Sequence, residues 1–71
     1  MATIDKEQRR GDLLDHALAV FSEKGYHAAK VEDIVSRAGV ARGTFYLYFE
    51  DKRATFAELL DSFVARLRAA I

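Results

Sequence analysis

Apolar residues recur along this chain at helical spacing, in segments that glycines or short polar runs separate. In the first segment, residues 11–24, apolar side chains repeat every three or four positions and charged residues occupy the opposite side. Gly25 follows directly, and glycine often ends a helix because it adopts a positive φ at little cost. We therefore expect a first helix over residues 11–24, with the apolar stripe Leu13, Leu14, Ala17, Leu18, Val20 and Phe21.

A second amphipathic segment covers residues 30–38. Its apolar residues fall at i, i+3, i+4 and i+7, which places them on one face of a helix. Gly39 ends the segment where a positive φ is cheapest, and Val40 is expected to point back into the core and fix the angle of the turn. The apolar face consists of Val31, Ile34, Val35 and Ala38.

The aromatic run Phe45–Phe49 has two interpretations. By propensity alone it is a β-strand, but no other segment offers a partner strand, and an unpaired strand is not stable. In a helix, its two phenylalanines share one side with Val40, whereas Arg42 and Tyr46 face away. We therefore predict a short helix over residues 41–48.

The last apolar stripe begins at Lys52, directly after Asp51, a residue that favours the N-cap position. The stripe continues to residue 71, so we expect one helix over residues 52–71. Its last turn is apolar and carries no stop signal, which indicates that the helix packs against something further. The side chains expected to be buried are Phe56, Leu59 or Leu60, Phe63, Val64 and Leu67.

These segments define an all-α fold. A helix that ends at a glycine, a tight turn and a second short helix are the parts of a helix-turn-helix (HTH) motif, which lays one helix in the DNA major groove. We expect a flexible N-terminal arm over residues 1–9, a three-helix HTH DNA-binding domain over residues 10–50, and the first part of a long fourth helix over residues 51–71.

Composition excludes several classes of protein without favouring DNA. The 71 residues contain 11 basic and 11 acidic side chains, a net charge of zero, whereas DNA-binding domains are usually basic. The case for DNA must therefore come from geometry. The sequence has no cysteine, which excludes a disulfide framework and a thiolate zinc site. Without a signal peptide or an apolar run near ~20 residues, we expect a soluble cytoplasmic protein with no membrane partner.

No pattern in the sequence indicates catalysis. Neither His16 nor His27 has a nucleophile nearby, and the carboxylates are scattered over polar faces. The glycines mark turns and a helix start rather than a phosphate-binding loop. We expect no enzymatic activity, no metal site and no cofactor.

Three features favour DNA binding instead. Arg42 and Thr44 lie at the N-terminal end of the short helix, the end that an HTH directs at base edges, and arginine pairs bidentately with guanine. Gly43 removes a side chain where that helix would approach DNA closely. Lys52 lies at a helix N-terminus, where a phosphate would meet the ammonium group and free backbone N–H groups. The alternatives are exposed polar residues, a frayed helix start and an ordinary surface lysine.

A combination of motifs also resembles a known family. At these positions the sequence is similar to the DNA-binding domain of the TetR family of bacterial transcriptional repressors, over about residues 10–63. The residues that carry the resemblance are Arg10, Leu13-Leu14, Ala17, Phe21, Gly25-Tyr26, Val31, Ile34, Ala38-Gly39-Val40, Gly43-Thr44-Phe45-Tyr46, Phe49 and Lys52.

The resemblance implies that residues 41–48 form the recognition helix. Thr44 and Tyr46 would share phosphate contacts, and Lys52 would hold a phosphate from the next helix. Lys30 stands where a serine or threonine often caps the second helix, which weakens the cap but can supply a phosphate contact. The DNA-contacting residues implied in this way are Lys30, Arg42, Gly43, Thr44, Tyr46, Leu47, Tyr48 and Lys52.

The resemblance also implies partners. Members of the family are homodimers on palindromic double-stranded DNA operators, and their larger C-terminal domain, which is not in these 71 residues, binds a small-molecule inducer. An alternative of a different class is a small helical interaction module. It would pair with a partner helix through the apolar stripe Phe56, Phe63, Leu67 and Ile71.

Overall fold

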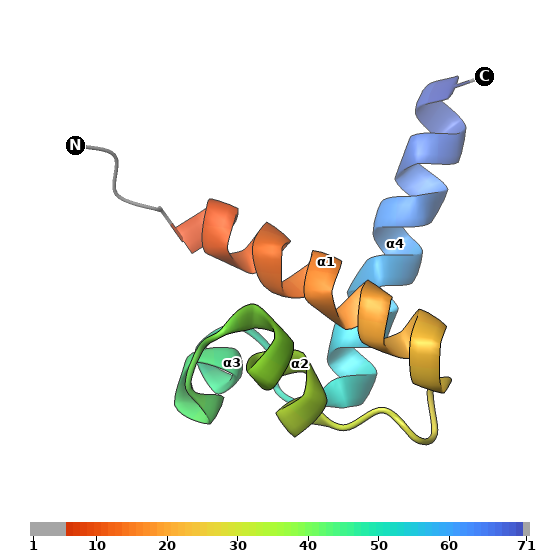
Figure 1. The fold of residues 1–71 in the computed structure, drawn as a ribbon. Helices are drawn as coiled ribbons and strands as arrows, with labels where there is room; N and C mark the ends of the chain where they lie inside the picture. The colour runs from red at the N-terminus through yellow and green to blue at the C-terminus, as the bar shows by residue number, and fades with distance from the viewer. Residues whose placement is uncertain (1–5, 71) are drawn as a thin grey trace.

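Four helices make up the part of the chain that the computed structural model describes, residues 6–70 (Figure 1). They are α1 (Lys6–Lys24), α2 (Val31–Ala38), α3 (Arg42–Tyr48) and α4 (Lys52–Ala70). No strand occurs within these residues, so the predicted all-α class is confirmed. Helix α1 packs against α2 and α4, and α2 packs against α3.

Helix α1 begins earlier than its apolar stripe predicts. We expected its first turn near residue 11, but the helix starts at Lys6, so that prediction was wrong; the rest of the expected arm, residues 1–5, lies outside the described residues. Residues 6–10 (Lys-Glu-Gln-Arg-Arg) are strong helix formers, and their polar character marks an exposed turn rather than a break. Gly25 ends the helix as expected, with φ 82°.

One apolar core holds the helices together. Phe45 of α3, Ile34 of α2 and Leu13 of α1 are fully buried, and the packing of three helices around them explains why a sequence of high strand propensity adopts a helix over residues 42–48. The buried apolar residues of the cluster are Leu13, Ala17, Val20, Phe21, Ala29, Ile34, Val35, Phe45 and Phe49.

The turn between α2 and α3 fixes the orientation of α3. Gly39 adopts the left-handed conformation expected of it (φ 72°), and its N–H donates to the carbonyl of Ser36. The N–H of Val40 donates to the carbonyl of Val35 at 3.1 Å, and Val40 packs against the core as predicted. A residue with a Cβ at position 39 would be strained, so this glycine sets the angle at which α3 leaves the turn.

Helix α4 begins as predicted. The Oδ1 atom of Asp51 accepts a hydrogen bond from the N–H of Ala54 at 2.8 Å, which makes Asp51 the N-cap. Thr55, one turn in, is fully buried, and its hydroxyl donates to the Asp51 carbonyl at 2.9 Å. These two hydrogen bonds fix the first turn of α4 to Asp51.

The C-terminal half of α4 differs from the prediction. Phe63, Val64 and Leu67 were expected to be buried, but they are 62%, 46% and 52% exposed. Of the two alternatives Leu59 and Leu60, Leu59 packs against the core and Leu60 is 51% exposed. Figure 1 shows the reason: this half of α4 extends beyond the other three helices. Phe56, in the first half of α4, packs against the core as predicted, with its ring 5.5 Å from that of Phe21. Among residues 6–70, no helix is long and apolar enough to cross a membrane.

Candidate nucleic-acid interface

Helix α3 has one buried side and one open side. Its buried side is anchored by Phe45, which is inaccessible to solvent, and by Phe49 directly after the helix, which is 3% exposed. On the open side, Leu47 is 81% exposed and Tyr46 is 47% exposed, although leucine and tyrosine are usually more buried. A short helix held from one side and exposed on the other can enter a groove without rearrangement of the core.

Arg42, the first residue of α3, lies on this open side and has an acidic neighbour. Its Nη1 atom donates to the Oε1 atom of Glu32 on α2 at 3.2 Å, and both side chains are exposed. The sequence pattern indicates Arg42 but not Glu32, because the two residues are ten positions apart and meet only when α2 and α3 pack at this angle.

Gly43 leaves open space at the start of α3. A Cβ atom added there would meet nothing within 4 Å, so the glycine is not required by packing within the chain. Its backbone is therefore accessible to an incoming surface, as the sequence-based hypothesis needs. Thr44, the next residue, is half-buried, and its N–H donates to the carbonyl of Ala41 in the first turn.

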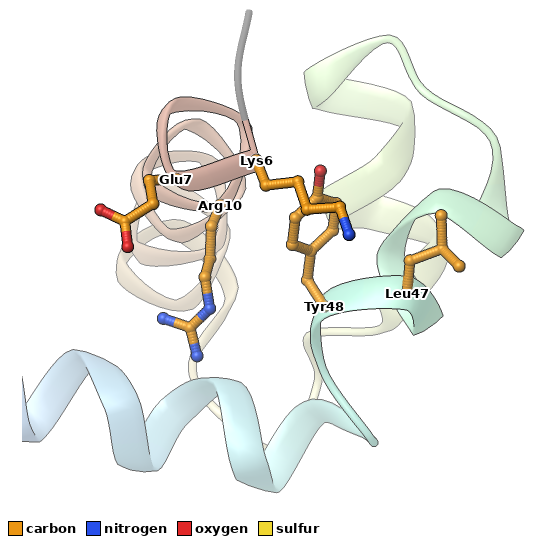
Figure 2. A pocket seen from close by; sticks show the side chains of 5 residues that line it. All are labelled: Lys6, Glu7, Arg10, Leu47 and Tyr48. Atoms are coloured by element: carbon orange, nitrogen blue, oxygen red, sulfur yellow. The ribbon is translucent and has the colours of Figure 1, made fainter.

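Tyr48 and Lys6 line a hollow of about 350 Å³ beside the end of α3, which Figure 2 shows. Tyr48 packs partly against the core, whereas Leu47, which also lines the hollow, is largely exposed. Lys6 was assigned to the N-terminal arm in the sequence analysis, and only the early start of α1 places it here. Arg10, in the same hollow, directs its guanidinium toward α4, where it pairs with Glu58 and lies 5.1 Å from the centre of the Phe49 ring.

Lys30 occupies the N-cap position of α2 and is exposed. Its side chain makes no capping hydrogen bond, as expected for a lysine, but its backbone N–H donates to Oδ2 of Asp33 at 3.0 Å. Asp33 also accepts a hydrogen bond from Lys24 at 3.1 Å, and this bond, followed by that from Lys30, lowers the pKa of the Asp33 carboxyl below its ordinary value of 3.8. The Asp33 carboxylate, at position N3, thus satisfies a backbone N–H at the start of α2, where the Lys30 side chain provides no cap.

Lys52 lies at the start of α4 as predicted, but its ammonium group has partners within the chain. It donates to the carbonyls of Tyr26 at 2.7 Å and Ala29 at 3.1 Å, with a longer contact to His27, and it lies 4.3 Å from the centre of the Tyr26 ring. A lysine has three N–H donors, and all three have acceptors here. This geometry supports a positioning role more than the phosphate contact that the family resemblance implies.

An exposed short helix that follows a glycine turn and is fixed from behind by a three-helix core is the arrangement of an HTH DNA-binding domain. The sequence model described as "Bacterial regulatory proteins, tetR family" matches residues 13–59. The chain belongs to this family.

The relatives are named as transcriptional regulators. The chain is 48% identical over 61 residues to an uncharacterized HTH-type transcriptional regulator, YdgC, of Bacillus subtilis (strain 168), a match that covers 86% of the chain and 31% of the relative. It is 36% identical to the HTH-type transcriptional activator FasR of Mycolicibacterium smegmatis, over 96% of the chain and 33% of the relative. It is 39% identical to the HTH-type transcriptional repressor KstR2 of Rhodococcus jostii, over 87% of the chain and 30% of the relative.

The chain thus spans about a third of the length of these relatives. No solved structure matches it significantly. The matched residues, 13–59, include the whole of α2 and α3 and the first turns of α4.

Proposed function

We propose that this chain is the DNA-binding head of a bacterial transcriptional regulator and inserts α3 into the major groove of duplex DNA. The observation that carries the proposal is the two-sided environment of α3. Phe45 is fully buried on one side, whereas Leu47 and Tyr46 are exposed on the other side with Arg42 at the N-terminal end. HTH proteins direct this end of the recognition helix at base edges.

The residues of the interface take distinct roles in this proposal. Arg42 reads a base edge, since its guanidinium is exposed and can pair bidentately with guanine. Gly43 allows the α3 backbone to approach the groove. Thr44 and Tyr46 contribute hydroxyl groups to phosphate oxygens, and Lys30 adds an ammonium group from the start of α2. Leu47 and Tyr48 contact the outer edge of the site.

The named relatives support a proposal about how a regulator that contains this chain acts. We infer that it acts in the cytoplasm as a homodimer on a palindromic operator, with the two heads in successive major-groove faces about 34–36 Å apart. Occupancy of promoter DNA would repress transcription, and the relatives include one named as a repressor and one named as an activator. An inducer site would belong to the two-thirds of the relatives' length that this chain does not cover.

Duplex binding by the chain itself tests the proposal. Fluorescence anisotropy of a labelled mixed-sequence duplex at low salt is expected to show saturable, salt-dependent binding that Arg42→Ala weakens. Arg37→Ala is a matched control, because Arg37 is also exposed and also pairs with a glutamate, Glu23, at 2.9 Å, but it lies on α2. Failure of the wild-type chain to bind, or an equal loss for both variants, would reject the assigned face.

The exposed half of α4 favours a second, compatible function in protein association. Leu60, Phe63, Val64 and Leu67 form an apolar surface on that half. Phe56, which the interaction-module hypothesis included, is packed against the core instead, and Ile71 lies outside the described residues. Sedimentation of the chain over a range of concentrations tests this function. Association that Phe63→Gln abolishes supports it, and a monomer at every concentration rejects it.

A further inference from the structure

Glu32 and Arg42 bring opposite charges to the same open face. Glu32 is the second residue of α2 and Arg42 is the first residue of α3, and their Oε1 and Nη1 atoms lie 3.2 Å apart. Their side chains are 69% and 60% exposed. An ion pair this exposed contributes little to stability because water screens it, so folding does not account for its presence.

The helix start favours an acidic residue at position 32 through the macrodipole, but it does not explain why the Glu32 side chain points toward α3. Asp33, its neighbour, caps α2 by accepting the N–H of Lys30, and it pairs with Lys24. The carboxylate of Glu32 is instead paired with Arg42, on the next helix. Any surface that receives Arg42 therefore meets a carboxylate at hydrogen-bonding distance from the guanidinium.

On DNA, such a carboxylate discriminates between sequences. The DNA phosphates repel the Glu32 carboxylate. This carboxylate also neutralises the positive charge of Arg42, which would otherwise attract the phosphates. In the major groove it accepts a hydrogen bond from the N4 amino group of cytosine, and the arginine donates to O6 and N7 of guanine. One G·C pair therefore offers a hydrogen-bonding partner to each of the two side chains.

We propose that Glu32 is a second specificity-determining residue, which reads the cytosine of a G·C pair whose guanine Arg42 reads and weakens binding to every other sequence. This inference rests on the proposed DNA-binding function. The pair lowers the affinity for DNA of most sequences. The affinity is recovered only at a base pair that satisfies the hydrogen bonds of both side chains.

The test compares Glu32→Met with Glu23→Met, because methionine has a similar length but carries neither the charge nor an oxygen acceptor. Both substitutions remove one negative charge and break one exposed pair with an arginine, but the Glu23–Arg37 pair lies away from α3. Duplexes are first selected from a random library with the wild-type chain. Anisotropy then gives the affinity of each protein for the selected duplex, for its single-base-pair variants and for a mixed-sequence duplex at several salt concentrations.

Glu32→Met is expected to bind the mixed-sequence duplex more tightly, with a salt slope steeper by about one unit because Arg42 is free to contact a phosphate. Its discrimination at one G·C pair should fall by about 5-fold, the lower end of the range for a bidentate base contact, because the cytosine contact is a single hydrogen bond. Arg42→Ala should lose discrimination at the same base pair, and Glu23→Met should behave as the wild-type chain does.

Two results would overturn the inference, and they differ from each other. If the wild-type chain binds and Glu32→Met keeps its salt slope and its preference at every base pair, Glu32 has no role in specificity although the proposed function stands. If the wild-type chain binds no duplex even at low salt, the proposed function fails and the inference fails with it.

Discussion

The ammonium group of Lys52, at the start of α4, donates a hydrogen bond to the backbone carbonyl of Tyr26 at 2.7 Å, and a second one reaches the carbonyl of Ala29 in the same loop. This loop joins α1 to α2. One side chain thus links the start of α4 to the segment that positions α2, and through α2 to the turn before α3. We propose that Lys52 orients the interface rather than holding a phosphate.

Replacement of Lys52 by methionine tests this role. Lys52→Met is expected to lower the free energy of unfolding by about 1–2 kcal/mol, because charge-assisted hydrogen bonds are lost and the carbonyls are left to water. Urea denaturation measures the loss, and Arg53→Met is the control for the removal of a positive charge from the same turn. A phosphate contact would instead lower the salt slope of duplex binding by about one unit with unchanged stability. That result would contradict the positioning role.

Arg42 is expected to determine base specificity. Arg42→Ala should lose about 1–3 kcal/mol of discrimination at one base pair, because a bidentate contact with guanine is removed. The measurement is the affinity for a selected duplex and for its single-base-pair variants. Equal weakening on all sequences would show that Arg42 contacts only phosphate.

Lys30 is expected to increase the affinity for all DNA sequences equally. Lys30→Met should reduce the salt slope of duplex binding by about one unit and leave discrimination between sequences unchanged, since an ammonium group on a phosphate releases one counterion and reads no base. A salt titration of anisotropy measures the slope. An unchanged slope would remove Lys30 from the interface.

Gly43→Ala is expected to change the stability of the fold and the affinity for DNA in opposite directions. The new methyl group meets nothing within 4 Å in the chain, so the variant is expected to be more stable by up to about 1 kcal/mol, the difference in helix propensity. Its duplex affinity should fall, because a side chain stands where α3 approaches the groove. Gly11→Ala is the matched control: Gly11 is also helical, its added Cβ also meets nothing within 4 Å, and it lies in α1. Unchanged duplex affinity in Gly43→Ala would show that the close approach does not occur at this residue.

The Asp33 carboxylate makes the free energy of unfolding depend on pH in the acidic range. Its pKa is lowered below 3.8, first by the hydrogen bond from Lys24 and then by that from Lys30, so the ionised carboxylate stabilises the fold above pH 3.8. This contribution is lost as the pH falls through the lowered pKa. Asp33→Asn should therefore be less stable than the wild-type chain at neutral pH, and the difference should narrow below pH 3.8. Urea denaturation at several pH values measures it. A difference independent of pH would show that the ionisation of Asp33 does not contribute to stability.

The sequence predicted the parts of this fold that local chemistry determines. The turn at Gly39, the cap at Asp51 and the buried side of α3 at Phe45 follow from residue type and spacing, and the structure confirms them. The start of α1 was missed because a polar helical turn and a polar arm have the same composition.

Contacts between helices could not be predicted in the same way. The pair Glu32–Arg42 and the hydrogen bonds of Lys52 depend on the packing angles of helices that are distant in sequence. The exposure of Phe63 was missed for a related reason, since an apolar stripe shows that a surface is to be covered but not whether the same chain covers it.

An amide NMR titration of the chain with a mixed-sequence duplex at low salt tests the central claim most directly, because it maps even weak binding onto individual residues. We expect chemical-shift changes concentrated at Lys30, Glu32 and residues 42–48, with little change in the second half of α4. Changes spread over α4 with none on α3, or no changes at all at millimolar DNA, would contradict the assignment of α3 as the DNA-binding surface.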